Sequence, residues 1–72
     1  MSATDAIRLA DAARAARNWP PLRVVFHDDG ALVSITTSRH DAERCAAPTI
    51  EEAAAKFVAL CEAEYPIAEV RP

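Results

Sequence analysis

The stretch that decides the fold is residues 22–37, LRVVFHDDGALVSITT. Two runs rich in β-branched and aromatic residues flank Asp29-Gly30, a dipeptide typical of a two-residue type I′ hairpin turn. A turn centred there predicts these cross-strand pairs: Leu22 with Thr37, Val24 with Ile35 and Phe26 with Val33 on one face; Arg23 with Thr36, Val25 with Ser34 and His27 with Leu32 on the other. Because side chains alternate between the two faces of a strand, this register predicts that the first, more apolar face is buried.

A helix is expected on each side of the hairpin. The Ala-rich residues 3–17 follow two candidate N-caps, Ser2 and Thr4, and this helix should end before Pro20-Pro21, since a residue that precedes proline disfavours the α region. The second helix is expected to begin at the capping box of residues 49–52, TIEE, and to end at Pro66. Its predicted buried sector consists of Ile50, Ala53, Ala54, Phe57, Val58, Leu60, Cys61 and Tyr65.

A third strand is predicted at about residues 42–47, with Ile35 opposite Cys45, Thr37 opposite Glu43 and Val33 opposite Ala47. The predicted fold class is therefore α+β, in the order α-β-β-β-α: a three-stranded antiparallel meander with two helices packed on one face. Residues 1–72 should form a single small domain, in which residues 66–72 are either an edge strand or a tail.

Composition and charge exclude several classes of protein. The chain has 72 residues, a formal net charge of -3 and one glycine, so it lacks the Gly-rich loops that bind phosphates or dinucleotides. A mildly acidic chain without a basic stripe is also a poor direct binder of nucleic acid. No apolar run approaches the roughly 20 residues that span a bilayer, and no leader is recognisable. We expect no membrane association and a cytoplasmic location.

The residues capable of chemistry are few. Cys45 and Cys61 are expected to be buried free thiols, because the spacing fits neither a disulfide scaffold nor a zinc knuckle. His27, His40 and Asp41 would carry a minor enzyme hypothesis, but no nucleophile motif accompanies them. We expect no catalytic, cofactor-binding or metal-binding residue, and therefore no enzyme. Trp19 is interpreted as closing the end of the core, with a place on a partner surface as the alternative.

A partner-binding surface is the remaining functional prediction. Acidic side chains are expected at the hairpin tip and on the exposed face of the second helix, and two apolar side chains on the open face of the sheet. The predicted partner-binding residues are Asp28, Asp29, Glu51, Glu52, Glu62, Val25 and Leu32. The alternative for the acids is a surface that only aids solubility.

Three resemblances bear on function. The element order resembles that of double-stranded-RNA-binding domains, but Glu51-Glu52 stand where basic residues would clamp phosphates, so RNA binding is not carried over. Residues 28–53, from Asp28-Asp29-Gly30 to the helix start TIEEA, resemble HicB-type antitoxins. In size, acidity and helix–sheet–helix layout, the chain also resembles small phage-encoded anti-CRISPR proteins.

The last two of these resemblances imply binding partners that are proteins. The leading expectation is a small acidic interaction protein, of phage or mobile-element origin, that binds and inhibits a host nucleic-acid-handling protein complex. The alternatives are an antitoxin that neutralises a small toxin and a homodimeric structural domain without a catalytic role.

Overall fold

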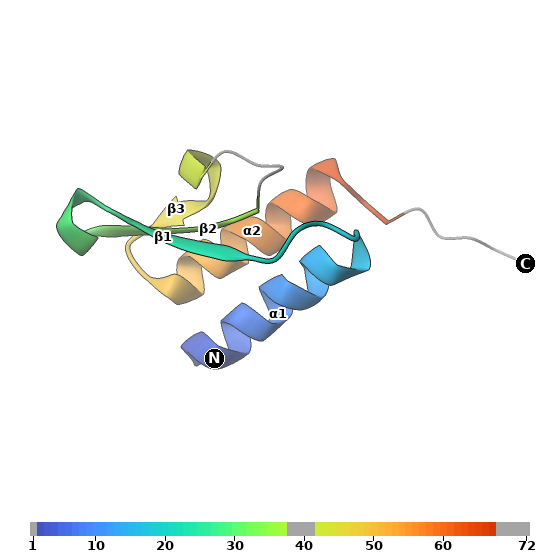
Figure 1. Ribbon diagram of the computed structural model, residues 1–72, viewed down its shortest axis with the longest axis horizontal. Helices are drawn as coiled ribbons and strands as arrows, with labels where there is room; N and C mark the ends of the chain where they lie inside the picture. The colour runs from blue at the N-terminus through green and yellow to red at the C-terminus, as the bar shows by residue number, and fades with distance from the viewer. Residues whose placement is uncertain (1, 38–41, 68–72) are drawn as a thin grey trace, which may run out of the picture.

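Two helices and a three-stranded antiparallel sheet make up the computed structural model, which describes residues 2–37 and 42–67. The order is α1 (Ala3–Ala16), β1 (Arg23–His27), β2 (Leu32–Thr36), β3 (Ala46–Ala47) and α2 (Ile50–Glu64), and the strands lie in the order β1-β2-β3 (Figure 1). The predicted fold class and element order are therefore confirmed. The two helices run side by side in the same direction (Figure 1).

The hairpin has the predicted register, and its loop of residues 28–31 contains the predicted turn at Asp29-Gly30. Arg23 to His27 pair with Thr36 to Leu32 in the expected order. Asp29 has φ 55° and ψ 32°, Gly30 has φ 91°, and the Ala31 N–H donates to the Asp28 carbonyl at 3.0 Å, which is the geometry of a type I′ turn. Glycine suits this φ because it has no Cβ to clash with the backbone.

Each helix begins at a predicted cap. The Asp5 N–H donates to the Ser2 hydroxyl at 3.1 Å, so Ser2 rather than Thr4 is the N-cap of α1. The Glu52 N–H donates to the Thr49 hydroxyl at 3.1 Å, as the capping box predicts. At the end of α1, Asn18 adopts φ 56°, and the Trp19 N–H reaches back to the Arg14 carbonyl in a Schellman motif.

The core lies where α2 packs against β2. Phe57 and Ile35 are fully buried in one cluster with Val33, and both thiols belong to it. Trp19 is also buried there and lies edge-to-face with Phe57, at 6.4 Å between ring centroids. The interpretation of Trp19 as a core residue is confirmed, as is burial of the central apolar positions of α2; only Tyr65, from the predicted buried sector, is exposed.

The third strand is shorter than predicted. Val33 pairs with Ala47 as expected and Ser34 pairs with Ala46, but residues 42–45 form a 3-10 turn instead of extending the strand. The predicted pairs of Ile35 with Cys45 and Thr37 with Glu43 are therefore wrong. Ala and Glu favour strands weakly, and the turn places the Cys45 side chain in the core. Pro66 and Ile67 lie outside any strand, and residues 68–72 are outside the described residues.

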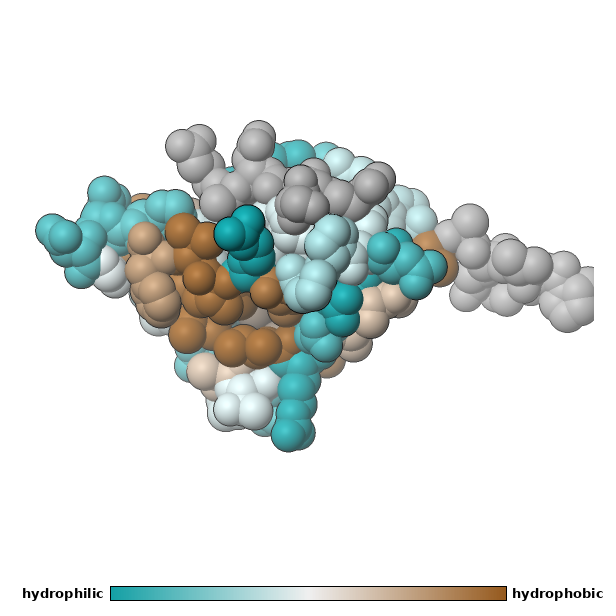
Figure 2. Space-filling view, viewed as in Figure 1, coloured by the Kyte–Doolittle hydropathy of each residue, from teal (hydrophilic) through white to brown (hydrophobic). Residues whose placement is uncertain are grey.

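The burial of the two sheet faces also differs from the prediction. Ser34 and Thr36, expected on the open face, are buried because the 3-10 turn of Ala42–Cys45 packs against β2. In contrast, Val24 and Phe26, expected in the core, are 39% and 65% exposed. The reason is that α1 packs alongside α2 instead of covering β1, and an apolar hollow is visible over β1 and beside α1 (Figure 2).

Candidate partner-binding site

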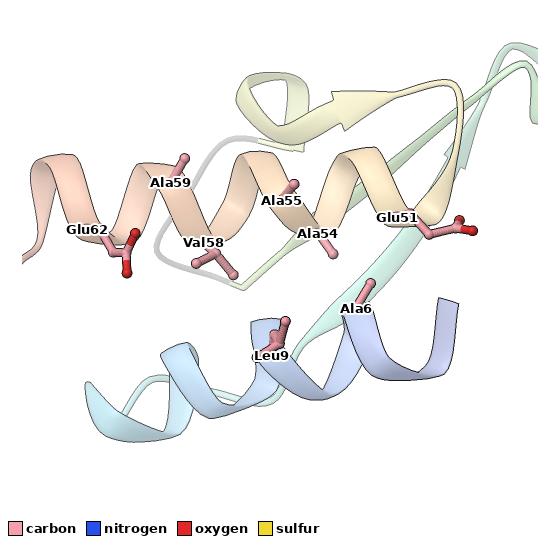
Figure 3. A pocket seen from close by; sticks show the side chains of 8 residues that line it. All are labelled: Ala6, Leu9, Glu51, Ala54, Ala55, Val58, Ala59 and Glu62. Carbon is pink, nitrogen blue, oxygen red and sulfur yellow. The ribbon is translucent and has the colours of Figure 1, made fainter. Parts of the chain in front are cut away.

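A shallow groove of about 260 Å³ runs between α1 and α2. Its lining is almost entirely apolar and consists of Ala6, Leu9, Ala54, Ala55, Val58 and Ala59, with Glu51 and Glu62. Small side chains make the groove, since Ala6 and Ala54 are buried where the helices approach each other. Leu9 is 51% exposed and points from α1 toward α2 (Figure 3).

A carboxylate stands at each end of the groove. Glu51 and Glu62 lie on the same side of α2 with the alanines and Val58 between them (Figure 3). They are eleven positions apart, which is about three turns or roughly 16 Å of helix. Both are exposed, and neither forms an ion pair with a residue in the described ranges. An apolar floor between two unpaired carboxylates suits a partner segment with an apolar face and basic ends.

The other acids of α2 are engaged within the fold. The Thr49 hydroxyl donates to the Glu52 carboxylate at 3.1 Å, at the helix N-terminus. Arg44 forms an ion pair with Glu64, and this hydrogen bond and charge raise the pKa of Arg44. Glu51 and Glu62 are therefore the carboxylates of this helix that remain available to a partner.

Arg17 holds the two helices at the far end of the groove. Its guanidinium donates to the carbonyls of Ala13 at 2.8 Å, Tyr65 at 2.7 Å and Cys61 at 3.2 Å. These contacts place a positive charge at the C-terminal ends of both helices, where the helix dipoles favour it. The guanidinium also lies 5.8 Å from the Trp19 ring centre, which in turn packs edge-to-face on Tyr65. These contacts of Arg17 therefore set the spacing between the two helices that form the groove walls.

The seven predicted partner-binding residues do not form one surface. Glu51 and Glu62 share the groove, and Glu52 lies at the capping box outside its lining. Asp28 and Asp29 are exposed at the hairpin tip, while Val25 and Leu32 are half-buried on the sheet face that also carries Ser34. Their role in binding stays a prediction.

Leu9, Ala55 and Ala59 are not among the predicted partner-binding residues, although all three line the groove. The predicted buried sector of residues 50–65 leaves out both alanines. A usable signal was present, because Glu51, Ala55, Ala59 and Glu62 follow each other at four, four and three residues and so share one side of a helix. That α1 lies beside this stripe could not be deduced from the spacing.

The thiols are buried and free, as predicted. Burial raises the pKa of both Cys45 and Cys61, which keeps them in the neutral form. Because the thiolate is the reactive species, neither is a suitable nucleophile.

His27 contacts Ser34, and the register predicted for the hairpin already places these two residues close together. Its Nε2 lies 2.6 Å from the Ser34 hydroxyl, and the two residues are diagonal neighbours on one face of the hairpin. A histidine beside a serine resembles a base and a nucleophile, but Ser34 is fully buried and no substrate can reach it. The contact satisfies a buried hydroxyl. His40 and Asp41 lie outside the described residues.

No group of three or more His, Cys, Asp or Glu side chains within residues 2–37 and 42–67 is placed to hold a metal ion. None of the helices described combines the length and the apolar character needed to cross a membrane. Comparison of the chain with family models, curated proteins and solved structures finds no match.

Proposed function

We propose that this protein is a small acidic interaction protein that binds a basic, amphipathic segment of a protein partner in the groove between α1 and α2. The observation that carries the proposal is the apolar groove with Glu51 at one end and Glu62 at the other. The fitting segment is a helix with an apolar face and Lys or Arg residues about 11 positions apart, the same spacing as the two carboxylates.

The charge of the partner suggests its class. Proteins that handle nucleic acid present Lys and Arg on the surfaces that bind phosphates. A chain of net charge -3 with two exposed carboxylates beside an apolar groove is suited to occupy such a surface. We therefore propose that binding inhibits a host nucleic-acid-handling complex, which is the role implied by the resemblance to small phage-encoded anti-CRISPR proteins.

The groove can be tested with a designed peptide. The probe is a helical peptide with a leucine and alanine face and two lysines 11 positions apart, and binding is measured by fluorescence polarisation. We expect the variant E51Q/E62Q to weaken binding about tenfold, the size of two partly exposed ion pairs. The control variant D28N/D29N makes the same change in net charge at the hairpin tip and should bind as the parent does. Equal loss in both variants, or no binding by the parent, would reject the groove.

The partner is then identified through the same groove. A photo-crosslinking residue in place of Ala59, at the groove wall, should capture one protein in the source cell, and E51Q/E62Q should reduce the capture. The captured protein's nucleic-acid binding is measured with and without the chain. Loss of that binding supports inhibition. A captured small toxin would instead support the antitoxin role, and a partner that binds no nucleic acid would overturn the inhibitor proposal.

A further inference from the structure

We propose that two copies of this chain pair through their β1 strands, antiparallel about a two-fold axis at Val25, to form one continuous sheet. The proposal is independent of the groove between the helices. It rests on Phe26 and Val24, which are 65% and 39% exposed on a strand at the edge of the sheet. A large aromatic side chain is costly to leave in water, and the second copy supplies the apolar surface that would cover it.

The two edges of the sheet are unlike each other. β3 has two residues, and the Lys56 ammonium donates to the Ala46 carbonyl at 2.8 Å, so this edge is short and partly occupied. β1 has five residues, of which three are Val24, Val25 and Phe26, and no described strand pairs with its outer edge. An exposed apolar edge of this kind is a template for another strand. Pro20 and Pro21 stop the pairing just before β1, because proline has no N–H to donate.

The sequence of β1 selects the register. With the axis at Val25, Val24 of each copy lies opposite Phe26 of the other, on the same face of the joined sheet. An axis at Phe26 would place Val24 opposite Asp28, and an axis at Val24 would place His27 opposite Pro21. A shift by one residue would put the apolar faces of the two copies on opposite sides of the sheet. The Val25 register avoids these losses within β1, because it pairs Arg23–His27 with the same five residues of the other copy and leaves Pro21 and Asp28 outside the paired strands.

Charge complementarity favours the same register. Arg23 lies opposite His27 of the other copy and is therefore diagonal to Asp29 at the tip of that copy's hairpin. The two-fold axis repeats this pairing at both ends of the interface. In the single chain, Arg23 forms no ion pair with a residue that the structure describes. A strand pair of this length gives a small interface, so we expect a reversible dimer that forms with rising concentration.

Sedimentation velocity over a range of protein concentrations tests the dimer. We expect the variant V24T/F26T, which places a residue of high strand propensity at both exposed positions, to raise the dimer dissociation constant about tenfold or more. The control L9Q changes an apolar residue of similar exposure in the groove and should dimerise as the parent does. A parent that stays monomeric at millimolar concentration, or a dimer lost in L9Q and kept in V24T/F26T, would overturn the proposal.

Cross-linking tests the register. Under mild oxidation, V25C should form a covalent dimer, because the two-fold axis places each copy of that residue opposite itself at a distance a disulfide can span. V24C faces Phe26 of the other copy and should not cross-link. The native thiols are buried and give little background. Equal cross-linking of V24C and V25C would reject the Val25 register.

Discussion

Phe57 and Phe26 are the two phenylalanines of the chain, and they lie in contrasting surroundings. Phe57 is fully buried against Trp19, at the end where Arg17 ties both helices together. Phe26 is 65% exposed on an edge strand that neither helix covers. The same side chain is thus a structural residue in one place and a surface feature in the other. The small core of this chain is therefore concentrated on α2 and β2, while β1 keeps apolar surface exposed to solvent.

The largest expected effect is on the free energy of unfolding when each of the two phenylalanines is replaced by alanine. Phe57→Ala should lower the free energy of unfolding by about 3–5 kcal/mol, because it leaves a cavity in a core with few large side chains. Phe26→Ala should cost about 1 kcal/mol or less, since the ring already meets water. Urea denaturation of dilute protein, followed by circular dichroism, measures both.

The outcome of this pair of variants decides between two descriptions of β1. Similar destabilisation by both substitutions would mean that Phe26 belongs to the core and that β1 has no free apolar face. The difference between the variants, rather than either value alone, is the informative quantity, because the two remove the same atoms.

The pH dependence of the free energy of unfolding tests whether the two core thiols are neutral in the folded chain. Burial raises the pKa of Cys45 and Cys61 above the ordinary value of 9.0, so the folded chain keeps protons that the unfolded chain releases. Their contribution to stability is complete below pH 9 and is lost as the pH rises through the folded-state values. We therefore expect the free energy of unfolding to fall between pH 7 and pH 10.

Urea midpoints measured at pH 7, 9 and 10 follow this loss. C45A/C61A provides the control, because it removes both thiols and should show a weaker dependence over the same interval. An identical slope in this variant and in the parent would assign the loss to other groups and refute a neutral, buried thiol pair.

The smallest effect concerns the junction of the helices. Arg17→Gln should lower the free energy of unfolding by about 1 kcal/mol, because it removes the charge that faces the carbonyls of Cys61 and Tyr65. Arg8→Gln, at an exposed position of α1, is the matched control and should change little. Thermal unfolding of both variants measures the difference. Equal effects would show that the junction contributes no more than general surface charge.

The local features of the fold followed from the sequence because each depends on neighbouring residues. Asp29-Gly30 determined the turn and therefore the register of the hairpin, since the side-chain period of two leaves no equivalent alternative. Ser2 and Thr49 determined where the helices begin. The hydrophobic periodicity of residues 50–61 determined which side of α2 meets the core.

The tertiary structure alone decided which apolar surfaces stay open. Leu9, Val24 and Phe26 are as apolar as the buried residues, and their exposure follows from the place that α1 takes beside α2. That placement depends on contacts between residues far apart in the chain, such as Arg17 with Cys61 and Tyr65, and on alanines that let the helices approach. The sequence alone therefore determined the elements and their faces, whereas long-range packing determined which of those faces meet solvent, because burial depends on what lies opposite a residue.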